Sequence, residues 1–309
     1  MKSFLFLFLS VATLFARDVV DAKGECSINW TQGFIECRGE SAEGQNRYAA
    51  KISAKVVAQR NLLEVIKGVR IDSQSTIEDG MFSSEVIRSR VSGTIRGAQI
   101  ISNKYDKVQK FAVVTLKLQM GKDLLSALLS DPTQLSFNEK VMQLWSSFHI
   151  VNTLHATTYT AKDKKTIQKL LEDLRKNGDE KGTLYLSNIL NEIGTENYSG
   201  VLIDISEVAN FKKAMIVKLV DEDGKEIYPA KILSKKVLLK KNTSVGYIYG
   251  LDDAKNNKRV YHTPIEFKAK SVYKKRYSNI VLDKEQIEAL SRVDKSILEN
   301  AKIILVLGD

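Results

Sequence analysis

The mature part of the chain begins with a segment in which apolar and polar residues alternate. In "CSINWTQGFIEC", residues 26–37, two short alternating runs flank Thr31-Gln32, and this pattern predicts a β-hairpin with Thr31-Gln32 as its loop. The alternation places the apolar side chains on one face of the hairpin. The register predicted by the pattern pairs Cys26 with Cys37, Ile28 with Ile35, and Trp30 with Gly33.

Helical periodicity follows over residues 45–67. Apolar positions recur there at intervals of three, four or seven, and Gly68 is typical of a helix end. The residues predicted to face the core are Ala49, Ile52, Val56, Leu63 and Ile66.

The next segment predicts a strand, a helix and two further strands. "VRIDSQSTI" alternates as a strand, and residues 84–95 form a second helix that ends before Gly97. Val86, Val91 and Ile95 are predicted to face inward. "AQIISNKYD" and "QKFAVVTLKLQM" read as two strands joined by a short polar turn, so this compact unit ends near Met120.

The remainder predicts a connector and a second domain. Short helical patterns with polar breaks fill residues 121–192, and strands return from residue 199 in "GVLIDIS", "AMIVKLVD" and "KEIYPAKIL". Asp223-Gly224 between two of these strands predicts a hairpin, and a short helix over 283–292 precedes a closing strand, "KIILVL". The predicted fold is α+β: an N-terminal antiparallel sheet with two packed helices over residues 17–120, a helical connector over 121–192, and a second α+β domain over 193–309.

The first sixteen residues have the composition of a secretory signal. Lys2 precedes an apolar run from Phe4 to Phe15 that is too short to span a bilayer, and Ala16 or Ala22 is a suitable residue before the cleavage site. No lipidation motif precedes Cys26, and no apolar run beyond residue 16 approaches ~18 residues. We therefore expect a cleaved signal peptide, export to the periplasm and no transmembrane segment in the mature chain.

Export to an oxidising compartment favours a disulfide between the two cysteines. Cys26 and Cys37 are the only cysteines, which favours a disulfide over a metal site that would need three or four ligands. With Trp30 and Gly33 as the first hydrogen-bonded pair, the cysteines also fall on a hydrogen-bonded pair, with Cα atoms ~5.5 Å apart. Closing this loop contributes about 3 kcal/mol in the chain-entropy model.

Basic residues are concentrated in one part of the chain. The net charge is +10, and residues 231–276 hold thirteen Lys or Arg against Asp252, Asp253 and Glu266, so the rest of the chain balances to about zero. This distribution indicates an acidic partner, such as peptidoglycan, lipopolysaccharide or an acidic protein face; ordinary solvated lysine is the alternative. The export signal argues against nucleic acid. Two clusters form the candidate basic interaction patch: Lys235, Lys236, Lys240 and Lys241, then Lys274, Lys275 and Arg276.

The pattern contains no motif for catalysis, so we predict no catalytic, cofactor-binding or metal-binding residues, and no enzyme. "DEDGKE" at 221–226 lacks the ligands of a calcium loop, because Lys225 occupies its fifth position and Ile232 its twelfth. His149 and His155 are six residues apart, which does not place them on one helix face, and His262 is remote from both. The acids Asp204, Glu207, Asp221 and Asp223 fall on predicted strands and turns, with no sign in the sequence that they converge.

Several segments resemble a known family. "INWTQGFIECRGE", "RYAAKISAKVVAQRNLLEVIKGVRIDS", "TIEDGMFSSEVIRSRVSGTIRGAQIISNKYD" and "FAVVTLKLQM", within residues 28–120, resemble in order and spacing the bacterial Lpp-twenty lipoprotein-like domain. "YSGVLIDISEVANFKKAMIVKLVDEDGKEIYP", residues 198–229, is similar to a downstream segment of long members. It departs from them at Ile205-Ser206-Glu207, Lys213 and Ile216-Val217, and the lipidated cysteine of many members is missing.

The resemblance implies an envelope protein of the bacterial flagellum without catalytic residues. Such a protein would act in the periplasm at the outer membrane, within a larger ring assembly called the basal disk. Its expected partners are a FlgP-like lipoprotein and other flagellar envelope proteins, and motility would depend on it. The alternative is a periplasmic binding module for anionic cell-wall or lipopolysaccharide groups that is independent of the flagellum.

Overall fold

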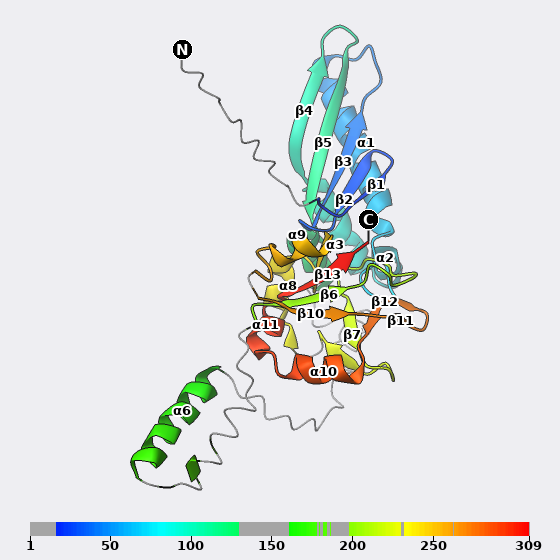
Figure 1. The fold of residues 1–309 in the computed structure, drawn as a ribbon. Helices are drawn as coiled ribbons and strands as arrows, with labels where there is room; N and C mark the ends of the chain where they lie inside the picture. The colour runs from blue at the N-terminus through cyan, green and yellow to red at the C-terminus, as the bar shows by residue number, and fades with distance from the viewer. Residues whose placement is uncertain are drawn as a thin grey trace, which may run out of the picture.

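The computed structural model describes residues 17–129, 161–177, 179, 182–183, 186, 198–229, 232–261 and 263–308. The predicted signal peptide, most of the predicted connector and the three histidines lie outside these ranges. The described chain is two-domain α+β, as predicted, with an N-terminal sheet and its helices standing above a C-terminal domain (Figure 1).

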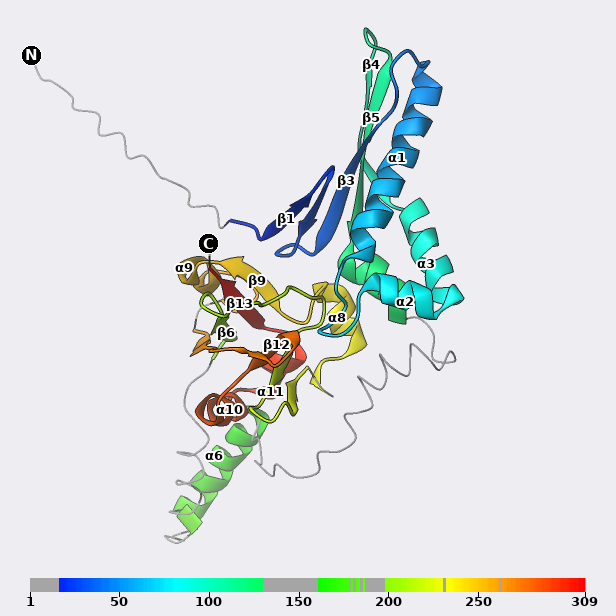
Figure 2. The same ribbon diagram turned by 90° about the vertical axis from the view of Figure 1, so that its right-hand side faces the viewer.

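The N-terminal domain is a five-stranded antiparallel sheet in the order β1-β2-β3-β5-β4. The strands are β1 (Val20–Lys23), β2 (Cys26–Asn29), β3 (Phe34–Glu40), β4 (Gln99–Asp106) and β5 (Phe111–Gln119). The long helix α1 (Arg47–Lys67) contacts β3 and β5 and lies along one face of the sheet (Figure 2). Strand β1 was not predicted; it pairs with β2 and forms one edge.

The predicted hairpin register and the disulfide are confirmed. Cys26 pairs with Cys37 and Ile28 with Ile35, and the two cysteines form a disulfide. The prediction of a hydrogen-bonded cysteine pair was wrong. The amide of Arg38 donates to the carbonyl of Glu25 at 2.8 Å, so the neighbouring pair carries the hydrogen bond. The cysteine Cα atoms lie 4.1 Å apart, close to the ~4.5 Å of a non-hydrogen-bonded pair.

The predicted inward face of α1 is confirmed at Ile66 and wrong at Ile52 and Val56, while Ala49 and Leu63 are half-buried. Ile52 and Val56 are 47% and 57% exposed, whereas the small residues between them face the sheet. Gly39 of β3 explains the difference: a Cβ at Gly39 would lie 2.2 Å from the backbone N of Ala58 and 2.3 Å from the carbonyl O of Ala54. Only small side chains fit where the helix and strand approach this closely. The buried residues are Ala50, Ala54, Ala58, Leu62 and Ile66.

The predicted strand after α1 is a loop. Arg70 makes one isolated bridge to Thr76, and the side chain of Asp72 holds the turn between them. Its Oδ1 accepts hydrogen bonds from the amides of Gln74 and Ser75 at 2.8 and 2.9 Å, and from the Ser75 hydroxyl at 2.9 Å. An acidic side chain that satisfies the local backbone amides competes with strand pairing, which explains the error.

Two shorter helices follow this loop. Helix α2 (Ile77–Ser83), which was not predicted, begins at a capping box formed by Thr76 and Asp79. Helix α3 (Glu85–Arg96) has the predicted bounds within one residue, with Ser84 as N-cap and Gly97 as C-cap. It buries Ile87, Val91 and Ile95, so Ile87 takes the inward position predicted for Val86. These three residues recur at intervals of four, on one helix face.

After β5 the chain forms a π-helical turn, η1 (Met120–Leu125), and the one-turn helix α4 (Ser126–Leu129). Helix α4 contacts α3, and η1 contacts α8 (Lys235–Lys241) of the C-terminal domain. Helix α6 (Ala161–Lys176) is the other described helix in the range predicted as a connector.

The C-terminal domain contains two four-stranded sheets. A parallel sheet has the order β10-β6-β13-β9, and a mixed sheet has the order β11-β12-β7-β8. The parallel sheet is formed by β6 (Val201–Asp204), β9 (Gly246–Tyr249), β10 (Ile265–Lys268) and β13 (Ile303–Leu307). The mixed sheet is formed by β7 (Lys218–Val220), β8 (Glu226–Tyr228), β11 (Val272–Tyr273) and β12 (Arg276–Val281).

Three predictions for this domain are confirmed. Asp223-Gly224 joins the antiparallel pair β7 and β8, with Gly224 at φ 86°. Helix α10 (Lys284–Ser291) lies in the predicted range, and the closing strand β13 pairs with β6 and β9 inside the parallel sheet. Helices α9 (Leu251–Lys255) and α11 (Lys295–Glu299) complete the domain.

Alternate residues of the parallel sheet enter two separate cores. Ile303 and Leu305 belong to the main core, whereas Leu202 and Ile304 pack with Val260 in a smaller one. Burial on both faces is typical of parallel strands. Among the described residues, we find no helix that could cross a membrane.

Substitution by alanine should have opposite effects on stability at Gly39, where α1 and β3 are in close contact, and at Gly93, which has open space around it. Gly39→Ala should lower the free energy of unfolding by about 1–3 kcal/mol, because its Cβ must displace helix backbone. Gly93→Ala in α3 has no heavy atom within 4 Å of the new Cβ and should raise it by about 0.5–1 kcal/mol. Urea unfolding followed by circular dichroism measures both, and wild-type stability for Gly39→Ala would contradict the packing.

Candidate functional site

The two domains are joined by hydrogen bonds between backbone segments that are far apart in the sequence. The carbonyls of Arg70 and Ile71, in the loop after α1, accept hydrogen bonds from the amides of Met215 and Ile216 at 3.1 and 2.8 Å. The amide of Ser244 in turn donates to the carbonyl of Met215 at 2.9 Å. Backbone pairing therefore runs across the boundary between the domains.

Side chains of the β2–β3 turn also enter this joint. The Thr31 hydroxyl donates to the carbonyl of Tyr247 in β9 at 2.8 Å and accepts from the amide of Val19 at 2.8 Å. The Trp30 ring packs edge-on against the Tyr247 ring, with centroids 5.6 Å apart. Tyr247 is fully buried, its hydroxyl donates to the carbonyl of Ala214 at 2.6 Å, and burial raises its pKa above the usual value. The main hydrophobic core is thus continuous through both domains.

Asn242 connects the two domains at a third point of the joint. It caps the C-terminus of α8 in the left-handed conformation, at φ 68°. Its Oδ1 accepts from the amide of Gly121 at 3.0 Å, and its Nδ2 donates to the carbonyl of Gln32 at 3.3 Å. Gly33 permits the contact, because a Cβ at Gly33 would lie 2.3 Å from the Asn242 Cβ.

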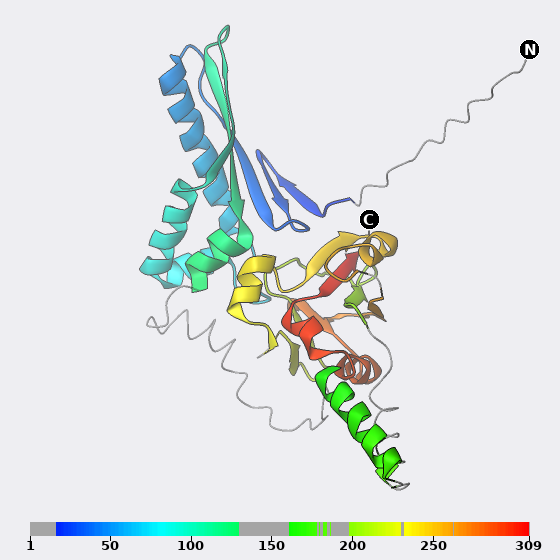
Figure 3. The same cartoon turned by 90° about the vertical axis from the view of Figure 1, so that its left-hand side faces the viewer.

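A groove of about 300 Å³ lies beside this joint. The N-terminal domain lines it with β1, β2 and the residues around Gly68, and the C-terminal domain lines it with residues 211–213 and Leu307. Figures 2 and 3 show β1 and β2 directly above β9 and β13 at this level of the molecule. The charged residues in the lining are Asp21, Lys23, Arg70, Lys212 and Lys213.

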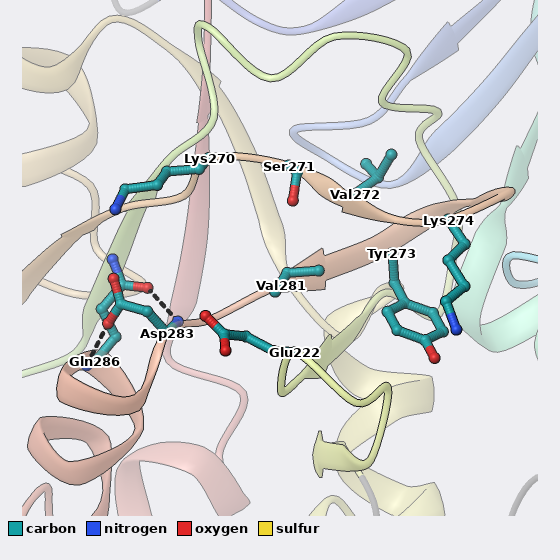
Figure 4. A pocket seen from close by; sticks show the side chains of 9 residues that line it. All are labelled: Glu222, Lys270, Ser271, Val272, Tyr273, Lys274, Val281, Asp283 and Gln286. Carbon is teal, nitrogen blue, oxygen red and sulfur yellow. Dashed lines mark hydrogen bonds between the residues drawn. The ribbon is translucent and has the colours of Figure 1, made fainter.

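A second pocket, of about 350 Å³, lies within the C-terminal domain between β11, β12 and the start of α10 (Figure 4). Asp283 and Gln286 form the capping box of α10. The amide of Gln286 donates to Asp283 Oδ1 at 2.9 Å, and the amide of Asp283 donates to Gln286 Oε1 at 3.1 Å. The Tyr273 hydroxyl donates to the carbonyl of Asp223 at 2.8 Å. The remaining charged residues of the lining are Glu222, Lys270 and Lys274.

The predicted basic residues lie in two places. Lys235, Lys236 and Lys240 are exposed on α8, and Lys235 Nζ donates to the carbonyl of Leu129. Lys274, Lys275 and Arg276 are exposed at the turn between β11 and β12. Figure 1 shows α8 and this hairpin on opposite sides of the C-terminal domain, so they form two clusters rather than one continuous patch.

The fourth lysine of the first cluster differs from its neighbours. Lys241 is half-buried, and its pKa is lowered first by burial and then by the charges of Arg259, Lys240 and Lys302. Burial lowers the pKa of Arg259 to about 10, while this guanidinium donates to the carbonyls of Ala301 and Thr243 at 2.6 and 2.8 Å. Arg259 is therefore a structural tie between β13 and the end of α8.

The acids considered from the sequence serve local structure. Asp204 accepts from the amide of Ser206 at 2.9 Å, and Asp221 accepts from the amide of Lys225 at 2.7 Å. Glu207 pairs with Lys268 at 2.6 Å on the surface. Within the described ranges, no three His, Cys, Asp or Glu side chains gather as metal ligands. "DEDGKE" is a hairpin turn, as predicted.

The role of Asn242 predicts a loss of stability when its side chain is removed. Asn242→Gly keeps the left-handed conformation but deletes both hydrogen bonds to the N-terminal domain, so unfolding should become easier by about 1–2 kcal/mol. Asn210→Gly is the matched control, because Asn210 is also left-handed, at φ 63°, but exposed; its change should stay within about ±0.5 kcal/mol. Equal stability of the two variants in thermal unfolding would show that the Asn242 contacts do not hold the joint.

Comparison with known proteins gives one match. Residues 200–309, from just before β6 to the C-terminus, match a protein-family model described as the second domain of Treponema pallidum Tp0624. None of the curated proteins matches the chain. The C-terminal domain is therefore similar to a second domain of a larger protein, and the resemblance of residues 28–120 to the Lpp-twenty domain stays a prediction.

Proposed function

We propose that this chain is a non-enzymatic structural protein of the bacterial flagellar motor. It acts in the periplasm at the outer membrane, with a FlgP-like lipoprotein, in assembly of the basal disk, and motility depends on it. The order of the segments in residues 28–120 and 198–229 supports this role, because together they resemble the flagellar protein FlgQ. The structural observation that carries the proposal is an exposed apolar face on a firmly held helix.

This face lies on α1, on the side away from the sheet (Figure 3). Tyr48, Ile52 and Val56 are 78%, 47% and 57% exposed and recur at intervals of four, so they form one stripe along the helix. Contiguous exposed apolar side chains are typical of protein interaction sites. Because the opposite face of α1 is packed on Gly39, the stripe is held in a fixed orientation.

Charge indicates the kind of partner. Between Arg47 and Leu63, α1 carries Arg47, Lys51, Lys55 and Arg60 and no acidic residue. A second copy of this chain, with a net charge of +10, is disfavoured as the occupant by like charge. A different protein with an apolar strip bordered by acids fits the face, and the FlgP-like lipoprotein is the proposed occupant.

Polar substitutions in the stripe should impair assembly without changing the stability of the fold. Ile52→Gln together with Val56→Gln should leave unfolding within about ±0.5 kcal/mol, since both positions are solvent-exposed. The same variant should lose co-purification with the lipoprotein and abolish swimming. Leu251→Gln with Tyr261→Gln, two exposed apolar residues of the C-terminal domain, is the control and should swim normally. Wild-type assembly and swimming of the α1 variant would refute this use of the helix.

The exposed lysines support a second candidate function, the binding of anionic cell-wall or lipopolysaccharide groups. Because the two clusters lie on opposite sides of the domain, each should be reversed separately: Lys236→Glu with Lys240→Glu, and Lys274→Glu with Lys275→Glu. Retention on purified sacculi should fall for the cluster that binds. Retention of the wild type should also fall as salt rises from 0.1 to 1 M, where the Debye length shrinks from ~10 to ~3 Å. Retention that neither salt nor either reversal reduces would remove this candidate.

A further inference from the structure

Five charged residues line the groove between the domains, and four of them are basic. Asp21 is its single acidic lining residue, and both carboxylate oxygens are already occupied. Oδ1 pairs with Lys213 Nζ at 2.7 Å, and Oδ2 accepts from Trp30 Nε1 at 2.8 Å. Asp21 and Lys213 therefore neutralise each other across the joint.

Three cations of the lining are left without an acidic partner among the described residues: Lys23, Arg70 and Lys212. Arg70 is held rigidly, since its Nε and Nη2 donate to the carbonyls of Asp72 and Ser73 at 3.2 and 2.7 Å. A guanidinium has five donor hydrogens, so this arrangement leaves donors available. The charged residues of the lining thus sum to about +3, and this sum includes the fixed guanidinium of Arg70.

The positions of the two lysines place charge on both sides of the groove. Lys23 Nζ lies 3.8 Å from the position that a Cβ at Gly68 would occupy, so the amine reaches from β1 across to the loop that carries Arg70. Lys212 lines the groove from the C-terminal domain, and its Nζ lies 5.1 Å from the centre of the ring of Tyr277, a β12 residue outside the lining. Both lysines are exposed.

Part of the groove lining is apolar. Ile28 and Trp30 contribute from β2 and its turn, and Phe211 contributes from the C-terminal domain. A volume of about 300 Å³ is at the lower end of the range for small-molecule sites, which also occur preferentially between domains. Cations and apolar side chains in one lining complement an anion attached to a compact body.

We propose that this groove binds a small molecule that carries a carboxylate or phosphate on a hexose-sized body, with contacts to both domains. Arg70 provides a fixed fork for the oxygens of the anion, Lys23 and Lys212 add charge from the two domains, and the aromatic side chains of the lining contact the body. Because the ligand contacts both domains, binding stabilises the joint and raises the melting temperature. This inference does not depend on the flagellar role.

The test uses the full mature chain with four probes: glucose 6-phosphate, glucuronate, inorganic phosphate and glucose. At least one of the two charged sugars should bind with a Kd below ~1 mM by calorimetry, and raise the melting temperature, whereas glucose should not bind. Inorganic phosphate should bind at least tenfold more weakly than the better charged sugar. Equal binding of phosphate and glucose 6-phosphate would contradict recognition of the body.

Charge reversal locates the site. Lys23→Glu and Lys212→Glu, both at exposed positions, should each weaken the charged sugar at least tenfold without changing the melting temperature of the free protein. Lys236→Glu with Lys240→Glu, exposed on α8 and outside the groove, is the matched control and should bind like the wild type. An equal loss in the control variant would assign binding to the general basic charge and overturn the proposal. Failure of both charged sugars to bind the wild type would also overturn it.

Discussion

The backbone hydrogen bonds from Met215 and Ile216 to the carbonyls of Arg70 and Ile71 hold the two domains in one arrangement. Apart from the bridge between Arg70 and Thr76, the loop after α1 forms no strand pairing in its own domain, and the carbonyls of Arg70 and Ile71 take their donors from the second domain. Thr31 and Asn242 repeat the same principle at two further points. Since the hydrophobic core runs through this joint, neither domain can shift without exposing apolar surface and unpaired backbone groups.

The fixed joint sets the positions of the other features. The apolar stripe of α1 stands in one orientation relative to the C-terminal domain, because α1 is packed on Gly39 and the sheet is fastened through Thr31 and Trp30. The same joint creates the groove, whose walls come from both domains. The groove depends on the distance between the domains, which a flexible linkage would not preserve.

The chain also keeps its different surfaces apart. The apolar stripe lies on the N-terminal domain, while the lysine clusters lie on α8 and at the β11–β12 turn of the C-terminal domain. The similarity to the second domain of Treponema pallidum Tp0624 concerns the C-terminal domain alone. The proposed protein partner of α1 and the proposed anionic ligand of the lysine clusters would therefore bind to separate surfaces of the chain.

The sequence by itself determined the features that depend on neighbouring residues. The β2–β3 register with its disulfide, the Asp223-Gly224 hairpin, the caps of α3 and the closing strand all follow from short-range alternation or turn chemistry. Tertiary structure decided which face of α1 is buried, because Gly39 leaves room only for alanines and so turns Ile52 and Val56 outward. It also decided that the carbonyls of Arg70 and Ile71 pair with Met215 and Ile216, and that the side chain of Asn242 reaches Gly121 and Gln32. In each of these cases the partner lies in a distant part of the chain, and periodicity records that a residue is apolar or polar but not which surface it will meet.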